Sequence, residues 1–144
     1  MIPVPKKVVI DTNVCLDLFV FNDPRWAKLV GAIERGEIEA VTRADCRDEY
    51  NIVLHYQHLP LDDDSRPLAA ARFDQLIKVV APPASAIKLP VCSDKADQKF
   101  LEIARDAGAE VLITKDKALL KLARRLAREG MFKVMLPEKW IALE

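Results

Sequence analysis

At 144 residues the chain has the length of one domain, and we expect residues 1–144 to form a single domain with one hydrophobic core. Hydrophobic residues make up 51% of the chain and charged residues 31%, with only four glycines, a composition typical of a compact globular enzyme or binding module and not of a disordered tail. The 22 basic and 22 acidic side chains cancel, so the net charge does not indicate a nucleic-acid partner.

The first half of the chain is predicted to alternate short strands with longer helices. Residues 8–10, Val-Val-Ile, are typical of a buried strand, and a short helix is predicted over residues 14–21. The next helix is predicted to begin with Asp23 as N-cap and Pro24 in the first helical position, and to end near Gly36. A strand at 38–42, a helix over 43–57 with Asp45 as a candidate cap, and a helix over 65–80 follow.

The second half continues the alternation after a proline-rich link at 82–90. A helix is predicted over 93–108, a strand over 110–114 and a basic helix that ends at Gly130. The chain closes with a strand over 132–136 and a helix over 137–144. Strands separated by helices predict an α/β fold with a mainly parallel sheet covered on both faces, whose ligands bind at the carboxyl ends of the strands.

Two further features of the sequence limit the class of protein. The chain has no apolar run near the ~20 residues of a membrane helix and no signal-peptide pattern, so we expect a cytoplasmic protein without membrane contact. The cysteines Cys15, Cys46 and Cys92 are odd in number and lack paired spacing, which indicates buried core residues, not a disulfide framework or a zinc site.

Acidic residues follow the predicted strands. Asp11 comes directly after residues 8–10, where it is expected to have no capping role, and Asp116 comes shortly after residues 110–114. Asp97 and Glu49 can reach the same edge from neighbouring helices. Four carboxylates in one cleft repel one another, and a hard divalent cation such as Mg²⁺ or Mn²⁺ relieves this repulsion.

Three of the acidic residues also have a simpler interpretation. Asp97 can be a first-turn acid that complements the helix dipole, and Asp94 can be a plain N-cap. Glu49 can be a solvated helix residue, with Asp48 beside it as a competitor for any role. These alternatives stay open on the residues alone.

The segments VVIDTNVCLDL, DEYNIVL, SDKADQKFLEIARDAGAEVLITKDKALL and VMLPEKWIAL follow one another in an order and spacing that resemble the PIN-domain nucleases. Within that family they look like the VapC-type toxins of bacterial toxin-antitoxin systems and their close relatives. The resemblance implies a three-layer α/β/α sandwich and a metal-dependent endoribonuclease that binds Mg²⁺ or Mn²⁺ through clustered acids. It also implies an RNA substrate, a small antitoxin protein and a toxin homodimer.

The resemblance assigns roles residue by residue. The catalytic and metal-binding acids fall on Asp11, Glu49, Asp97 and Asp116, with Asp94 as an additional acid. Asn13 and Thr114 match small polar residues that orient the acids. Apart from the resemblance, Thr12 is expected to belong to the turn after the first strand. Asp11, Asp97 and Asp116 are expected to bind a first ion, and Glu49 to share a second or to orient the attacking water.

Basic residues after Asp116 are candidates for contacts with the RNA backbone, although such a run is more often a solvated helix face. They are Lys115, Lys117, Lys121, Arg124, Arg125 and Arg128. His55 and His58 are spaced one helical turn apart, and we expect them at the surface or in a dimer contact, not at the metal.

Rival functions remain. A haloacid-dehalogenase-like phosphatase would need an acid two residues after Asp11, where Asn13 stands, and a receiver domain would need paired acids ahead of it, where residues 6–9 read KKVV. A non-toxin PIN nuclease that processes RNA, or a catalytically silent PIN-like module that binds RNA or protein, is also compatible with the resemblance.

Overall fold

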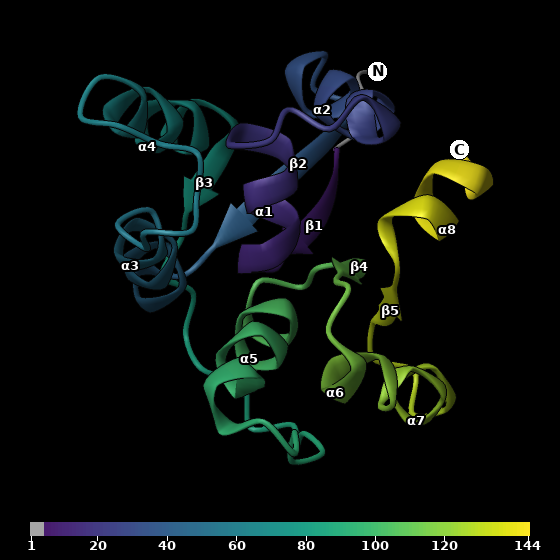
Figure 1. The fold of residues 1–144 in the computed structure, drawn as a ribbon. Helices are drawn as coiled ribbons and strands as arrows, with labels where there is room; N and C mark the ends of the chain where they lie inside the picture. Colours follow the sequence, from purple (N-terminus) through teal and green to yellow (C-terminus); the bar gives the residue numbers. More distant parts are fainter. Residues whose placement is uncertain (1–4) are drawn as a thin grey trace.

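Five parallel strands form one sheet with the order β3-β2-β1-β4-β5 (Figure 1). The computed structural model describes residues 5–144. The strands are β1 (Lys6–Ile10), β2 (Ile38–Thr42), β3 (Ile77–Val79), β4 (Val111–Ile113) and β5 (Lys133–Met135). All pairings between neighbouring strands are parallel, which confirms the predicted α/β fold.

Helices cover both faces of the sheet (Figure 1). On one face, Val8 and Ile10 pack in a hydrophobic cluster with residues of α1, α2, α3, α4 and α8. On the other face, Val9 packs with residues of α5, α6 and α7. The helices are α1 (Thr12–Phe19), α2 (Ala27–Glu34), α3 (Ala44–Val53), α4 (Ser65–Leu76), α5 (Gln98–Asp106), α6 (Lys117–Leu120), α7 (Ala123–Arg128) and α8 (Pro137–Leu143). Because consecutive strand residues face opposite helix layers, the molecule is the expected α/β/α sandwich.

One strand was missed by the sequence interpretation. Residues 65–80 were predicted as one helix, but α4 ends at Leu76 and Ile77–Val79 form β3 at the edge of the sheet. There Ile77 pairs with Ala40 of β2, and the Val80 N–H donates to the Thr42 carbonyl at 2.9 Å. The β-branched residues at the end of the segment gain more from pairing with β2 than from a further helical turn.

Helix ends also differ from the prediction. Asp23 caps as expected, accepting the Arg25 N–H, but it begins a 3₁₀ turn (Pro24–Trp26) ahead of α2. The predicted cap at Asp45 is wrong, because α3 begins after Arg43 without a side-chain cap and Asp45 pairs with Arg43 instead. The basic helix is divided into α6 and α7.

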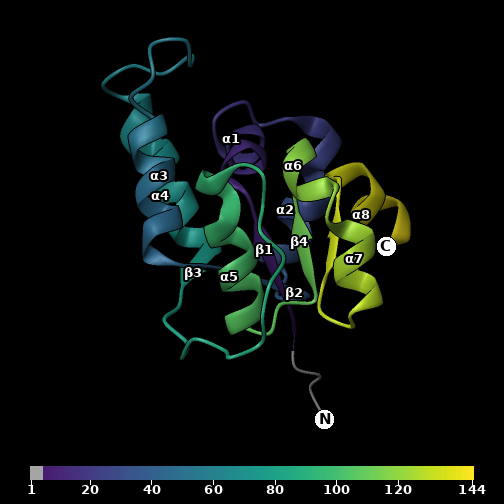
Figure 2. The same ribbon diagram turned by 90° about the horizontal axis from the view of Figure 1, so that it is seen from below.

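Helix α3 is shorter than predicted, since it ends at Val53. His55 and His58 therefore lie outside any helix, exposed in the connection between α3 and α4, which extends beyond the rest of the molecule in Figure 2. Within residues 5–144, no helix is long and apolar enough to cross a bilayer. The three cysteines are free and buried, as predicted.

Candidate metal centre

The sheet reverses its strand order between β1 and β4. The chain builds β2 and β3 on one side of β1, then returns to place β4 on the other side, with Ile10 aligned with Ile113. In open parallel sheets, a crevice forms at the carboxyl ends of the strands at such a point. The first residues beyond these two strands are Asp11 and Thr114.

Asp11 is held in place by donors from this chain. Its side chain is buried, Oδ1 accepts the Val14 N–H at 3.0 Å, and Oδ2 accepts the Thr114 hydroxyl. The expectation that Asp11 has no capping role is thus wrong, because it is the N-cap of α1. Burial raises its pKa to about 6, and the nearby carboxylate of Asp116 adds to the shift, while the Thr114 and Val14 hydrogen bonds oppose it.

Thr114 joins two of the predicted acids. While its hydroxyl donates to Asp11, the same oxygen accepts the Asp116 N–H at 2.9 Å. Asp116 in turn caps α6, with Oδ1 accepting the Ala118 N–H at 2.8 Å. The role predicted for Thr114, to orient the acids by hydrogen bonds, matches this geometry.

Three carboxylates gather beside this pair of strands. Asp94, Asp97 and Asp116 each offer an oxygen within 4.8 Å of the other two. Asp94 caps the 3₁₀ turn Lys95–Asp97 by accepting the Ala96 N–H, as the simpler interpretation anticipated, and this turn carries Asp97 to the group. The capping role of Asp94 does not prevent its carboxylate from facing the other two.

Asp97 is the least satisfied member of the group. Its Oδ2 is buried and receives no hydrogen bond from the described residues 5–144. Burial is the largest cause that raises its pKa to about 7, followed by Asp116, whose carboxylate can accept a hydrogen bond from protonated Asp97, and by Asp94 and Asp11. Two carboxylates share such a bond only when one of them is protonated.

This donor set fits a hard divalent ion. The three converging atoms are all carboxylate oxygens, and Mg²⁺ and Mn²⁺ prefer oxygen ligands. An ion beside Asp97 Oδ2 would supply the positive charge that this buried oxygen lacks.

Glu49 lies apart from the three-carboxylate group. Its Oε1 accepts a hydrogen bond from the Thr12 hydroxyl at 2.5 Å, and its Oε2 accepts one from the Lys99 ammonium at 2.5 Å. Asn13, expected to support the acids, is exposed, and both Asp11 oxygens are bonded to other residues. Thr12 and Lys99 are the functional candidates that sequence reasoning missed. The expectation that Thr12 belongs to the turn is wrong, because Thr12 is the first residue of α1. The one available signal was the position of each residue close to a predicted acid.

Comparison with known proteins agrees with this geometry. A family model described as PIN domain matches residues 7–118, which is more than half of the chain and includes every acid named above. The chain belongs to the PIN domain family. A search of curated proteins found no match. Membership of this family indicates that the chain is, in general terms, a nuclease.

The predicted RNA contacts of this PIN domain are exposed on α6, α7 and the residues beside them. Two are engaged in ion pairs: Lys115 Nζ lies 2.6 Å from Asp17 Oδ2, and Arg125 pairs with Glu129. Within residues 5–144, no ion pair involves the other four, which are Lys117, Lys121, Arg124 and Arg128. These four are the more available for a phosphate backbone.

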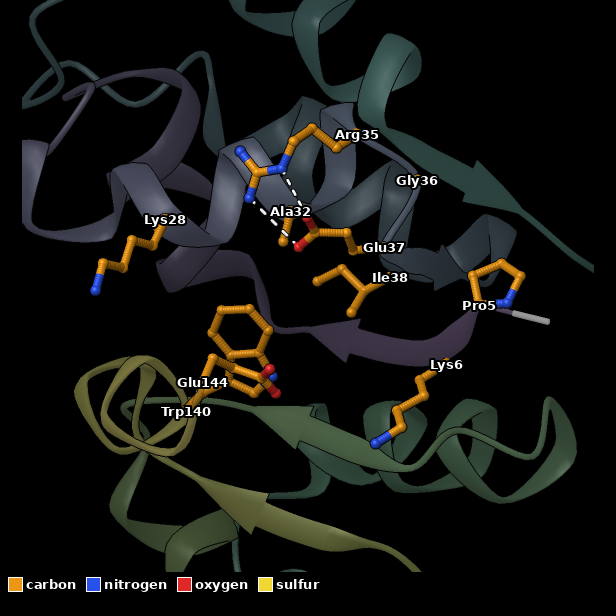
Figure 3. Close-up of a pocket in the computed structure, with 10 residues that line it drawn as sticks. All are labelled: Pro5, Lys6, Lys28, Ala32, Arg35, Gly36, Glu37, Ile38, Trp140 and Glu144. Carbon is orange, nitrogen blue, oxygen red and sulfur yellow. Dashed lines mark hydrogen bonds and ion pairs between the residues drawn. The ribbon is translucent and has the colours of Figure 1, made fainter. Parts of the chain in front are cut away.

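A pocket of about 570 Å³ lies at the opposite end of the sheet, by the first residues of β1 and β2 (Figure 3). The residues that line it include the basic side chains of Lys6, Lys28 and Arg35, together with Trp140. Figure 3 shows Arg35 paired with Glu37. None of the predicted acids of the PIN domain lines this pocket. The candidate centre is therefore the carboxylate cluster at the carboxyl edge.

Proposed function

We propose that the protein is a metal-dependent endoribonuclease that uses Mg²⁺ or Mn²⁺ to hydrolyse RNA phosphodiester bonds. The observation that carries the proposal is Asp97 Oδ2, a buried carboxylate oxygen without a hydrogen-bond donor, beside Asp94 and Asp116. Family membership supports the nuclease class, and the donor set supports the kind of ion.

The chain's own residues would hold the ion through Asp97 and Asp116, with Asp94 and Asp11 beside them. Asp116 has one oxygen bonded to the Ala118 N–H, which leaves its other oxygen available. Asp11 has both oxygens bonded, but each carboxylate oxygen retains a second lone pair. A bound divalent ion supplies a water of lowered pKa and stabilises the leaving oxygen. The Val14, Thr114 and Ala118 donors fix the carboxylates in advance, so little reorganisation accompanies the reaction.

RNA cleavage by the purified protein tests the proposal. End-labelled RNA incubated with Mg²⁺ or Mn²⁺ should be cut, EDTA should abolish the reaction, and Asp97→Asn should lower the rate by about 100-fold or more, the scale for a group that stabilises developing charge. Asp64→Asn, which changes an exposed Asp of α4's N-terminus, is the matched control and should cut like wild type.

Equal cleavage by wild type and Asp97→Asn, or cleavage that survives EDTA, rules out the metal-nuclease proposal. Mn²⁺ and RNA binding without any cleavage identifies the catalytically silent module instead. Cleavage of RNA with no effect on growth identifies the non-toxin processing nuclease.

We propose further that this activity belongs to the toxin of a toxin-antitoxin pair that acts in the cytoplasm. The support is the resemblance of the segments around Asp11, Glu49, Asp97 and Asp116 to VapC-type toxins. Such a toxin would form a homodimer and bind a small antitoxin protein. Expression of the gene alone in a bacterium should stop growth, and Asp97→Asn should restore it; normal growth with a demonstrably active enzyme contradicts the toxin role.

A further inference from the structure

An ion pair between Lys99 and Glu49 lies beside the proposed centre. Lys99, on α5, places Nζ 2.5 Å from Glu49 Oε2, and Glu49 comes from α3. The two side chains are only 16% and 29% exposed. Removing both charges from water is costly, and replacing such pairs with apolar residues is often neutral or stabilising, so stability alone is a weak reason for this pair.

Both oxygens of the Glu49 carboxylate accept hydrogen bonds. One oxygen accepts the Thr12 hydroxyl and the other accepts the Lys99 ammonium. Thr12 follows Asp11 directly in the chain. Glu49 therefore lies next to the centre, yet it is not among the three carboxylates whose oxygens converge, which are Asp94, Asp97 and Asp116.

Lys99 is anchored to the turn that carries these carboxylates. Its Nζ also donates to the carbonyl of Ala96, which lies between Asp94 and Asp97 in the 3₁₀ turn. The aromatic ring of Phe100 lies 5.2 Å from the same ammonium and adds a favourable cation–π contact. Three separate groups thus hold one positive charge at a fixed place beside Glu49.

We infer that the Lys99 ammonium takes the place of a second divalent cation, so that this centre binds one metal ion and Glu49 is a positioning residue, not a metal ligand. The inference rests on the proposed function. An ammonium and a divalent ion both neutralise a carboxylate, but they repel each other, so a second ion cannot bind Glu49 while Lys99 stays there. A centre with one ion differs from the expectation that Glu49 shares a second ion.

Metal stoichiometry tests the inference without reference to activity. Titration calorimetry with Mn²⁺ should give one ion per wild-type chain, with the six-line electron paramagnetic resonance spectrum of an isolated Mn²⁺. In Lys99→Met the Glu49 carboxylate loses its cation, so the variant should bind two ions, whose close approach, roughly 3.5 to 4 Å in two-metal sites, couples their spins. Lys99→Arg keeps the charge and should stay at one.

A double variant covers the case in which Lys99→Met does not fold. Glu49→Gln with Lys99→Met removes both charges, so the field at the centre changes little. It should bind one Mn²⁺ with at most about the 100-fold loss of affinity that follows from losing a group that orients a ligand. A larger loss makes Glu49 a ligand and overturns the inference.

The remaining outcomes are distinct. Two ions in wild type, or one ion in a folded Lys99→Met variant, overturn the single-ion inference while leaving the nuclease proposal intact. If wild type binds no Mn²⁺, or Asp97→Asn binds it like wild type, the proposed function itself falls.

Discussion

One hydroxyl group connects the ends of β1 and β4. Thr114 is fully buried, donates to Asp11 and accepts the Asp116 N–H. Replacing it with valine leaves that N–H without its partner and releases Asp11 from one of its two donors. We expect Thr114→Val to lower the free energy of unfolding by about 1–3 kcal/mol, the cost of an unsatisfied polar group. We also expect it to weaken Mn²⁺ binding.

Urea unfolding and Mn²⁺ titration measure these effects. Thr42→Val is the matched control, because Thr42 is a buried threonine at the end of the neighbouring strand β2 and no side-chain hydrogen bond of the described residues involves it. The control should change stability and Mn²⁺ binding little. Equal effects of the two substitutions would show that the Thr114 hydroxyl does no more than fill space.

Residue patterns located the acids better than their partners. Asp11 and Asp116 could be placed because each follows an apolar strand, whereas Thr114 was assigned only through the resemblance to PIN-domain nucleases. Thr12 and Lys99 could not, since their contact with Glu49 depends on how α1, α3 and α5 pack, which no local pattern encodes. A capping role for Asp11 was missed because only this residue separates the strand from the helix, whereas the helix was predicted to begin at residue 14.

The short helices α6 and α7 form an exposed basic surface that begins at the centre, because Asp116 caps α6. If Lys121, Arg124 and Arg128 contact RNA phosphates, changing all three to glutamine should weaken RNA binding. The slope of log affinity against log salt should then fall by about 2, because each contact with a single strand contributes roughly 0.7.

The control for this prediction lies at the other end of the molecule. Lys6, Lys28 and Arg35 line the pocket at the amino ends of β1 and β2, whereas the carboxylates lie at the carboxyl ends of the strands. Changing these three residues to glutamine therefore removes the same amount of positive charge at the opposite end of the sheet. Filter binding at several salt concentrations compares the two variants. An equal loss of slope in both would show that the basic surface has no special part in binding.

At the level of elements, the sequence pattern predicted the four strands that have strong apolar runs. It missed β3, which lacks such a run. The segment 65–80 has enough helix formers for a single helix, and only the pairing of Ile77–Val79 with β2 turns its end into a strand. The basic helix divides at Lys121 and Leu122 although its residues favour helix throughout, so local propensity did not reveal the break.

For the whole molecule, the raised pKa values of Asp11 and Asp97 predict that the metal-free protein loses stability as pH rises. Between the ordinary pKa of 3.8 and folded values of about 6 and about 7, the folded state binds more protons than the unfolded state. The free energy of unfolding therefore falls through this window, by about 3 kcal/mol for Asp11 from its pKa shift alone.

Thermal unfolding in EDTA at pH 5 and pH 8 measures this effect. Asp97→Asn should show a smaller loss between the two pH values, whereas the exposed control Asp64→Asn should match wild type. Mn²⁺ requires the ionised carboxylates, so it should raise the melting temperature more at pH 8 than at pH 5. A metal-free protein that gains stability from pH 5 to pH 8 would contradict this account of the carboxylates.

The position of β1 between β2 and β4 has a consequence for synthesis on the ribosome. Proteins emerge from the amino terminus, so β1, β2 and β3 are complete while β4 is still unmade, and one edge of β1 stays open. Asp97 and Asp116 also arrive late. A nascent chain that ends before residue 116 therefore carries only part of the cluster, and the proposed nuclease centre is complete only after most of the chain has been made.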